Sequence, residues 1–235
     1  MIIVFEGADG VGKSSVINEL KNDPFIKDND FIFCKEPADN DKYLKTLRNL
    51  ILTEENYKIS DFLLLMASRA RHFKKYIIPH INEKNFIFDR YTYSSFVYQL
   101  EHEKDLSYMN QIIKITFEHL TEGKLEVFNK IVSPDIVFYF VCDLKKQIDR
   151  QKEQKNEIFR FEKKSMIEKA KIKEKYEKLF VQTIKDDLGN PKEALHSNVF
   201  KIDTTNKSII EIKKICLEKI KEFIENEAKK IQTNK

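Results

Sequence analysis

Five short apolar segments recur along the chain, and each is rich in β-branched and aromatic residues. These segments are Ile2 to Phe5, Phe31 to Cys34, Phe86 to Phe88, Ile136 to Cys142 and Val199 to Ile202. Segments that are apolar at every position, and not only at alternate ones, are typical of strands buried on both faces of a parallel sheet. The pattern therefore predicts a five-stranded parallel sheet.

Longer segments between these strands have apolar residues at the spacing of an α-helix. The clearest apolar stripe consists of Ile59, Phe62, Leu63, Met66, Ala70, Phe73 and Ile77, and Pro79 ends it. Residues 145–185 and 207–230 are dense in Lys and Glu and are expected to form amphipathic helices with solvated faces. Alternating strands and helices predict an α/β fold, with the sheet flanked by helices, and the length fits a single domain over residues 1–235.

Composition narrows the classes of protein that the chain can belong to. Hydrophobic residues make up 41% of the chain, which is too apolar for a disordered protein. The 42 basic and 38 acidic residues interleave along the chain, so we expect no nucleic-acid partner. The three cysteines, Cys34, Cys142 and Cys216, have apolar neighbours and favour reduced thiols in the cytoplasm. Neither a secretion signal nor a membrane span is expected, because no apolar segment approaches about 18 residues.

The residues that follow the first strand match the phosphate-loop pattern G-x-x-x-x-G-K-[ST]. The residues expected to bind ATP are Gly7, Ala8, Asp9, Gly10, Val11, Gly12, Lys13, Ser14 and Ser15. The pattern lies between a predicted strand and a predicted helix, so that backbone N–H groups and the helix N-terminus can surround phosphate oxygens. Lys13 is expected to reach the β- and γ-phosphates and Ser14 to ligate Mg²⁺.

Asp9 lies inside this loop, where its carboxylate would be repelled by a bound triphosphate. We therefore expect Asp9 to face a hydroxyl or a cationic group of a second substrate beyond the γ-phosphate. The alternative is a turn residue that serves only the backbone.

A second group of polar residues follows the third predicted strand, at the edge where open α/β sheets bind ligands. Asp89 is expected to organise Mg²⁺ and Arg90 to bind a phosphate, although the two could instead form a structural salt bridge. Helical spacing then places Ser94, Ser95, Tyr98 and Gln99 on one side of a helix. That side could bind a base or a ribose, or it could be an ordinary solvated face.

Several motifs, in this order, resemble those of thymidylate kinases. They are Phe5 to Ser14, Lys35-Glu36-Pro37, Ser68-Arg69-Ala70-Arg71-His72 and Asp89-Arg90-Tyr91 continuing to Gln99; Pro134-Asp135, Arg160-Phe161-Glu162 and Ile202-Asp203 extend the resemblance over almost the whole chain. The resemblance implies a three-layer P-loop NTPase-type fold with a helical lid at about residues 145–162. It also implies a homodimer that transfers the γ-phosphoryl group of ATP to deoxythymidylate with Mg²⁺.

The resemblance assigns roles to individual side chains of the second substrate site. Asp9 would meet the sugar 3′-hydroxyl, Arg48 and Arg90 the acceptor phosphate, and Arg69 the thymine carbonyl. The full set expected to bind the acceptor is Asp9, Glu36, Pro37, Arg48, Leu65, Arg69, Arg90, Ser94, Ser95, Tyr98 and Gln99.

The sequence departs from the family pattern at the base site and in the phosphate loop. Leu65 replaces the usual aromatic residue one helical turn before Arg69, Ser68 replaces an acid, and Ala38-Asp39 follows Glu36-Pro37 where glycines are usual. With Gly10 in the loop, no arginine is available there, so Arg150 and Arg160 of the lid are the candidates for that role. The residues expected to act in catalysis are Lys13, Asp9, Arg90, Arg150 and Arg160.

Three other functions are compatible with parts of the sequence. A kinase of another nucleoside monophosphate or of a deoxynucleoside would share the phosphate loop and differ around Leu65 and Arg69. A guanine-nucleotide switch is disfavoured because Asn129-Lys130-Ile131-Val132, the segment closest to N-K-x-D, ends in valine. A nucleic-acid-binding module would bind DNA at low salt.

Overall fold

The computed structural model describes residues 1–55, 57–102, 105–153, 165–180 and 198–233. The strands are β1 (Ile2–Glu6), β2 (Phe31–Lys35), β3 (Asn85–Asp89), β4 (Ile136–Val141) and β5 (Val199–Asp203). All neighbouring strands are parallel, in the order β2-β3-β1-β4-β5. The five predicted strands are therefore confirmed.

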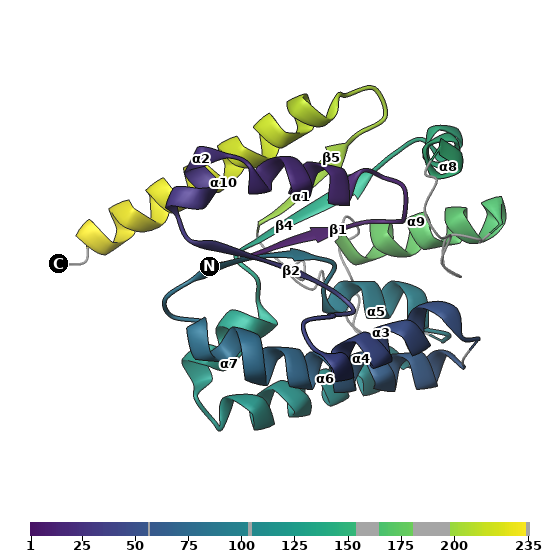
Figure 1. Ribbon diagram of the computed structural model, residues 1–235, viewed down its shortest axis with the longest axis horizontal. Coiled ribbons are helices and arrows are strands. Elements are labelled where there is room, and N and C mark those ends of the chain that lie inside the picture. Colours follow the sequence, from purple (N-terminus) through teal and green to yellow (C-terminus); the bar gives the residue numbers. More distant parts are fainter. Residues whose placement is uncertain (56, 103–104, 154–164, 181–197, 234–235) are drawn as a thin grey trace, which may run out of the picture.

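Helices cover both faces of this sheet and give the predicted three layers (Figure 1). They are α1 (Lys13–Lys21), α2 (Pro24–Asp28), α3 (Lys42–Thr53), α4 (Lys58–His72), α5 (Thr92–Gln99), α6 (Asp105–Thr121), α7 (Leu125–Val132), α8 (Leu144–Glu153), α9 (Met166–Phe180) and α10 (Ile209–Thr233). In Figure 1, α1, α2 and α10 lie on one face of the sheet, and α4 to α7 lie on the other. None of the helices in the described ranges is long and apolar enough to cross a lipid bilayer.

The strands extend beyond their apolar segments at the carboxyl edge of the sheet. Glu6, Lys35, Asp89 and Asp203 each continue a strand by one polar residue, while Cys142 falls outside β4. The central strand β1 is buried along its whole length because β3 and β4 pair with its two sides. The apolar pattern thus locates the core, and the polar residues that end the strands lie where the site is built.

The apolar stripe after residue 58 does not form one regular helix. Helix α4 ends at His72, a wider π-helical turn follows at Phe73–Ile77, and a 3₁₀ turn at Ile78–His80 contains Pro79. Ile59 and Leu63 are 57% and 50% exposed and do not belong to the core. These two residues lie four apart, on a face of α4 that the inward-facing residues do not share.

His72 is a buried histidine among aromatic rings. Its ring lies 6.0 Å from the rings of Phe73 and Tyr76 and 6.2 Å from that of Phe88. Among the described residues, neither nitrogen of the His72 ring has a hydrogen-bond partner. Burial lowers the pKa of His72 to about 4, so the folded protein favours the neutral ring.

We expect His72 to make the folded state sensitive to acid. Its stabilising effect is fully present above the unfolded pKa near 6.5 and is lost as the pH falls through the folded pKa. Protonation in this range should lower the free energy of unfolding by roughly 2–3 kcal/mol between pH 7.5 and pH 4.5. Urea unfolding of the His72→Leu variant should show a smaller loss over this range. His80→Leu, at an exposed histidine, is the control, and equal pH dependence in all three proteins would contradict the expectation.

Candidate active site

The phosphate loop connects the carboxyl end of β1 to the first turn of α1. Gly7 and Gly10 have φ of +138° and +82°, which side chains rarely tolerate. A Cβ atom on Gly7 would lie 2.4 Å from the carbonyl oxygen of Phe140, and one on Gly10 would lie 2.7 Å from the Cγ of Gln151. Glycine is therefore required at both positions, for backbone conformation and for space.

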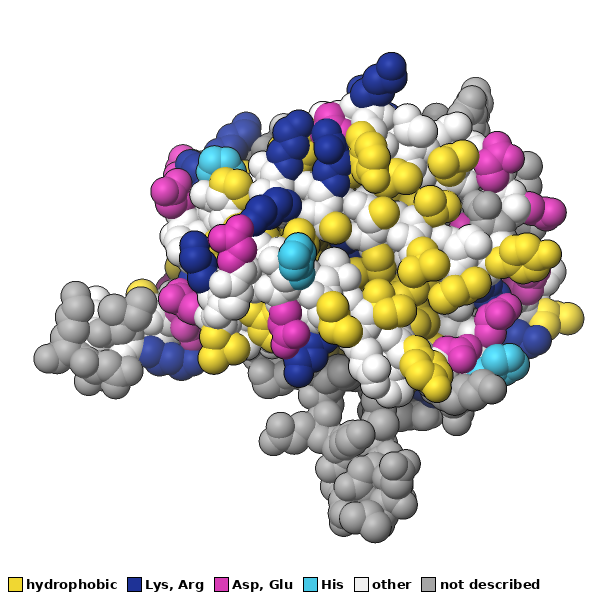
Figure 2. Space-filling model, turned by 90° about the horizontal axis from the view of Figure 1, so that it is seen from below, with side chains coloured by type: hydrophobic (Ala, Val, Ile, Leu, Met, Phe, Trp, Pro, Cys, Tyr) yellow, Lys and Arg dark blue, Asp and Glu magenta, His cyan; other side chains and the backbone are white. Residues whose placement is uncertain are grey.

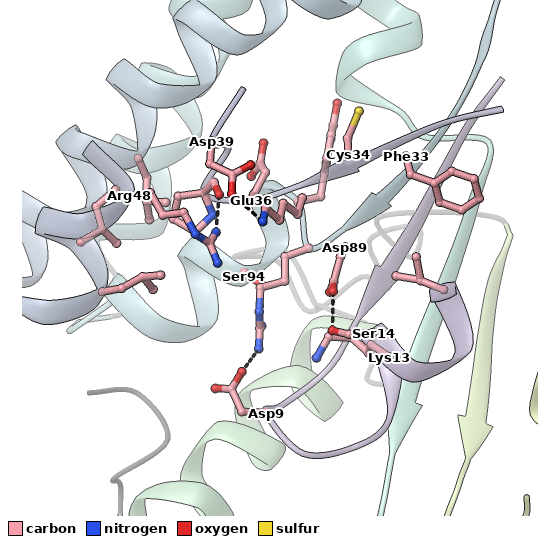
Figure 3. Close-up of a pocket in the computed structure, with 18 of the residues that line it drawn as sticks. Asp9, Lys13, Ser14, Phe33, Cys34, Glu36, Asp39, Arg48, Asp89 and Ser94 are labelled. Atoms are coloured by element: carbon pink, nitrogen blue, oxygen red, sulfur yellow. Dashed lines mark hydrogen bonds and ion pairs between the residues drawn. The ribbon is translucent and has the colours of Figure 1, made fainter. Parts of the chain in front are cut away.

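Lys13 and Ser14 hold the polar groups expected to meet a nucleotide. The ammonium group of Lys13 donates to the carbonyl oxygens of Gly7 and Ala8, each at 2.8 Å. Burial and the nearby Arg90 lower the pKa of Lys13 to about 8, and bound phosphates would favour its charged form again. The hydroxyl of Ser14 donates to the Asp89 carboxylate at 2.6 Å (Figure 3).

Ser14 at the start of α1 and Asp89 at the end of β3 bring a hydroxyl and a carboxylate together. Hydroxyl and carboxylate oxygens suit Mg²⁺, which usually binds one or two protein oxygens together with phosphates and water. The alternative salt bridge between Asp89 and Arg90 is not seen, because Asp89 turns towards Ser14 and Arg90 pairs with Asp9. The two residues thus fit a magnesium ion.

Arg90, which was predicted to bind the acceptor phosphate, follows β3 directly. Its backbone has a φ of +71°, in the left-handed region, and its guanidinium forms an ion pair with Asp9 (Figure 3). The hydroxyl of Tyr98 donates to the same Asp9 carboxylate at 3.1 Å. Although burial acts to raise it, the pKa of Asp9 lies below its ordinary value because Arg90 and Lys13 stabilise the carboxylate. Asp9 therefore faces a cation of its own chain, at the place expected for a second substrate.

Arg69 is held on several sides within the core beneath this site. Its Nε donates to Glu36 at 2.7 Å, and its terminal nitrogens donate to Ser95 Oγ at 2.8 Å and to the Tyr91 carbonyl oxygen at 2.9 Å. Ser95 is fully buried and supports Arg69 from behind. Contacts of this kind fix the direction in which Arg69 presents its charge.

Two buried acceptor oxygens face the same cleft. Oε1 of Glu36 and Oε1 of Gln99 have no hydrogen-bond partner among the described residues, and both side chains line the cleft. Burial raises the pKa of Glu36, although Arg69 opposes this effect. A ligand that brings hydrogen-bond donors would satisfy both oxygens.

These groups surround one cleft of about 580 Å³ between the phosphate loop and helices α3, α4 and α5. The predicted site residues that line it are Asp9, Gly10, Gly12, Lys13, Ser14, Glu36, Pro37, Arg48, Leu65, Arg69, Asp89, Arg90, Ser94, Tyr98 and Gln99. Arg48 donates to the carbonyl oxygen of Pro37 and faces the cleft from α3 (Figure 3). The volume is within the range of small-molecule sites.

Of the two candidate lid arginines, Arg150 lies within the described residues and Arg160 does not. Arg150 lies on α8, donates to Thr204 Oγ1 at 3.0 Å and to its carbonyl oxygen at 2.8 Å, and lies close to Gly12. Arg160, with half of the predicted lid, lies outside the described residues. The catalytic role of either arginine stays a prediction.

The sequence did not predict three residues that support the site through hydrogen bonds. Glu6 accepts hydrogen bonds beside Arg90, Tyr176 of α9 reaches the same group, and Gln147 of α8 donates to the carbonyl oxygen of Asp9 at 2.5 Å. Glu6 had a signal, since it is a charged residue directly after an apolar strand. Tyr176 and Gln147 had none, because residues on an amphipathic helix do not indicate a distant partner.

A glycine-rich phosphate loop facing an arginine-lined cleft at the carboxyl edge of a parallel sheet defines a P-loop phosphotransferase. The sequence model of the thymidylate kinase family matches residues 5–199, and the chain belongs to that family.

Curated relatives extend this result. The thymidylate kinase of Acholeplasma laidlawii is 32% identical over 156 residues, which is 65% of this chain and 70% of the relative. The thymidylate kinase of Campylobacter hominis is 29% identical over 227 residues, covering 95% of this chain and all of the relative. A solved thymidylate kinase from Candida albicans has the same fold, with a TM-score of 0.59 and 22% identity over 94% of this chain and 90% of the other.

Proposed function

We propose that residues 1–235 form a single kinase domain that acts in the cytoplasm and transfers the γ-phosphoryl group of ATP to deoxythymidylate. The observation that carries this proposal is the position of two anion sites on one cleft. The phosphate loop with Lys13 lies on one side, and Arg48 and Arg90 line the same cleft. A donor and an acceptor phosphate could therefore meet between them.

Positioning and charge neutralisation account for the chemistry of this transfer. The acceptor phosphate oxygen is already anionic, so no general base is needed. Lys13 and Arg90 would neutralise charge on the transferring group, and a lid arginine, Arg150 or Arg160, would add a further cation. Mg²⁺ held by Ser14 and Asp89 would bind phosphate oxygens and withdraw charge from them.

The acceptor nucleoside would lie between Asp9 and Arg69. Asp9, which accepts from Tyr98, would meet the sugar hydroxyl, while Arg69, held by Glu36, would donate to a carbonyl oxygen of the base. Gln99 lines the cleft, and its buried Oε1, which has no hydrogen-bond partner among the described residues, would accept from an N–H of the same base. A pyrimidine with both kinds of group, such as thymine, satisfies this arrangement.

ADP release with Mg²⁺-ATP and each common nucleoside monophosphate, and with thymidine, tests the proposal. Deoxythymidylate should give the highest kcat/KM of the series. In the Lys13→Ala variant, kcat should fall by at least about 10²-fold, because one preorganised cationic contact is lost from the transition state. A higher kcat/KM with thymidine or with another monophosphate would contradict the proposed acceptor. A near-normal kcat in Lys13→Ala would show that Lys13 does not contribute to catalysis.

Leu65 is expected to limit affinity for the base. It is 8% exposed, lines the cleft, and lies one helical turn before Arg69. Leu65→Phe should lower the KM for deoxythymidylate about two- to tenfold with little change in kcat, since stacking would stabilise ground state and transition state alike. Steady-state kinetics measures both constants. A destabilised variant with unchanged KM would assign Leu65 to packing alone.

We also propose that the chain forms a homodimer through the face of α3, α4 and α6. Large apolar side chains are exposed on all three helices, and Figure 2 shows hydrophobic side chains gathered on this side of the molecule. They are Tyr43, Leu50, Ile59, Leu63, Tyr108 and Ile115. Exposed apolar areas of this kind mark protein interfaces, and a second copy is the occupant that the family resemblance implies.

Sedimentation analysis should find a dimer that Leu63→Glu converts to a monomer, because the variant places a charge in the apolar contact. Leu125→Glu on α7 is the matched control, since Leu125 is exposed to 69% and lies outside the proposed face. A monomeric wild type, or a dimer that survives Leu63→Glu, would contradict this interface.

A further inference from the structure

Tyr176 lies far from every motif of the chain, yet its hydroxyl reaches the second anion site. It belongs to α9 and is fully buried. Its hydroxyl oxygen lies 2.9 Å from Glu6 Oε2, 3.0 Å from Ser94 Oγ and 3.2 Å from Arg90 Nη1. Polar groups from two other parts of the chain, the end of β1 and the junction of β3 with α5, thus converge on one tyrosine.

The direction of each hydrogen bond in this group follows from Glu6. Its carboxylate accepts from the backbone N–H groups of Tyr91 and Ser94, at 2.7 and 3.2 Å, and from the hydroxyls of Ser94 and Tyr176, at 2.8 and 2.9 Å. Burial raises the pKa of Glu6, but Arg90 and these donors favour its ionised form, which only accepts hydrogen bonds. Both hydroxyl hydrogens therefore point to Glu6, and both hydroxyl oxygens are left to accept from Arg90.

The two terminal nitrogens of Arg90 therefore contact different groups. Nη1 donates to Ser94 Oγ at 3.0 Å, to Tyr176 Oη at 3.2 Å and to the Gly7 carbonyl oxygen at 3.1 Å. Nη2 forms the ion pair with Asp9. The side of the guanidinium that bears Nη1 is anchored in the protein, and the side that bears Nη2 is directed to the cleft.

We propose that Tyr176 is a positioning residue that sets the orientation of Arg90 towards the acceptor phosphate. The proposal rests on the phosphoryl transfer proposed above and adds α9 to the elements that build the site. Tyr176 acts through Arg90 and does not touch the substrate.

The ring of Tyr176 has a separate role that the hydroxyl does not share. It stacks on Tyr139, with centroids 5.6 Å apart and planes at 28°, and on Phe180, at 6.1 Å and 13°. Phenylalanine would keep these contacts. A buried hydroxyl is unfavourable unless it is hydrogen-bonded, so the hydroxyl of Tyr176 is explained by the polar group that it completes.

Tyr176→Phe tests the proposal with deoxythymidylate and Mg²⁺-ATP as substrates. We expect kcat to fall about tenfold with the KM for ATP unchanged, because one hydrogen bond that aligns a transition-state contact is removed. Tyr139→Phe is the matched control, since it removes a hydroxyl from the same ring stack whose one hydrogen-bond partner among the described residues is Glu177, at 3.4 Å, and it should keep kcat within about twofold. A normal kcat in Tyr176→Phe, or equal losses in both variants, would overturn the proposal.

A double-mutant cycle with Arg90→Lys separates positioning from packing. Lysine lacks the planar fork, so in that background Tyr176→Phe should change kcat less than about twofold. A further tenfold loss there would overturn the proposal. Should Tyr176→Phe lose its melting transition, Ser94→Ala takes its place in the cycle with the same expectations. If the wild-type protein does not phosphorylate deoxythymidylate, the proposed function is refuted. That result differs from failure of the Tyr176 proposal, in which the wild type is active and Tyr176→Phe does not alter kcat as expected.

Discussion

The buried carboxylate of Glu6 is the group on which the acceptor side of the site depends. It ends the central strand and accepts the N–H groups at the start of α5, so a side chain of the sheet takes the place of a capping residue on that helix. Burial raises the pKa of Glu6, while Arg90 and the hydroxyl of Ser94 act in the opposite direction. One anion thereby connects β1, α5, α9 and the arginine after β3, and the cleft takes its shape from that connection.

Much of this architecture follows from local sequence signals. The strands are predicted by continuous apolar segments, and the phosphate loop by glycines whose backbone conformations exclude other residues. Asp89 and Arg90 were predicted at the end of β3, because parallel strands direct their final residues to one edge of the sheet. Signals of this kind depend only on residues within a few positions of one another, so they can be read from the sequence alone.

Contacts between residues that are distant in sequence could not be predicted from these local signals. Nothing in the sequence indicated that Asp9 would pair with Arg90, 81 positions away. Nor did the sequence indicate that Ser95, expected in the base pocket, would accept a hydrogen bond from Arg69. Ile59 and Leu63 fitted the helical period of the core and nevertheless lie on the surface, because the spacing gives the face of a helix but not the element that covers it.

The contact between α8 and the phosphate loop has a consequence for how this sequence can evolve. Gln147 donates to the carbonyl oxygen of Asp9, and Gln151 fills the space next to Gly10. A side chain at position 10 would meet the positive φ of the loop, the Cγ of Gln151 at 2.7 Å and the carbonyl oxygen of Gln147 at 3.1 Å from its Cβ. A smaller residue 151 would remove only one of these obstacles, so a descendant could gain an arginine at position 10 only if the loop backbone and α8 also changed. Position 10 is therefore evolutionarily coupled to the placement of α8, and not to residue 151 alone.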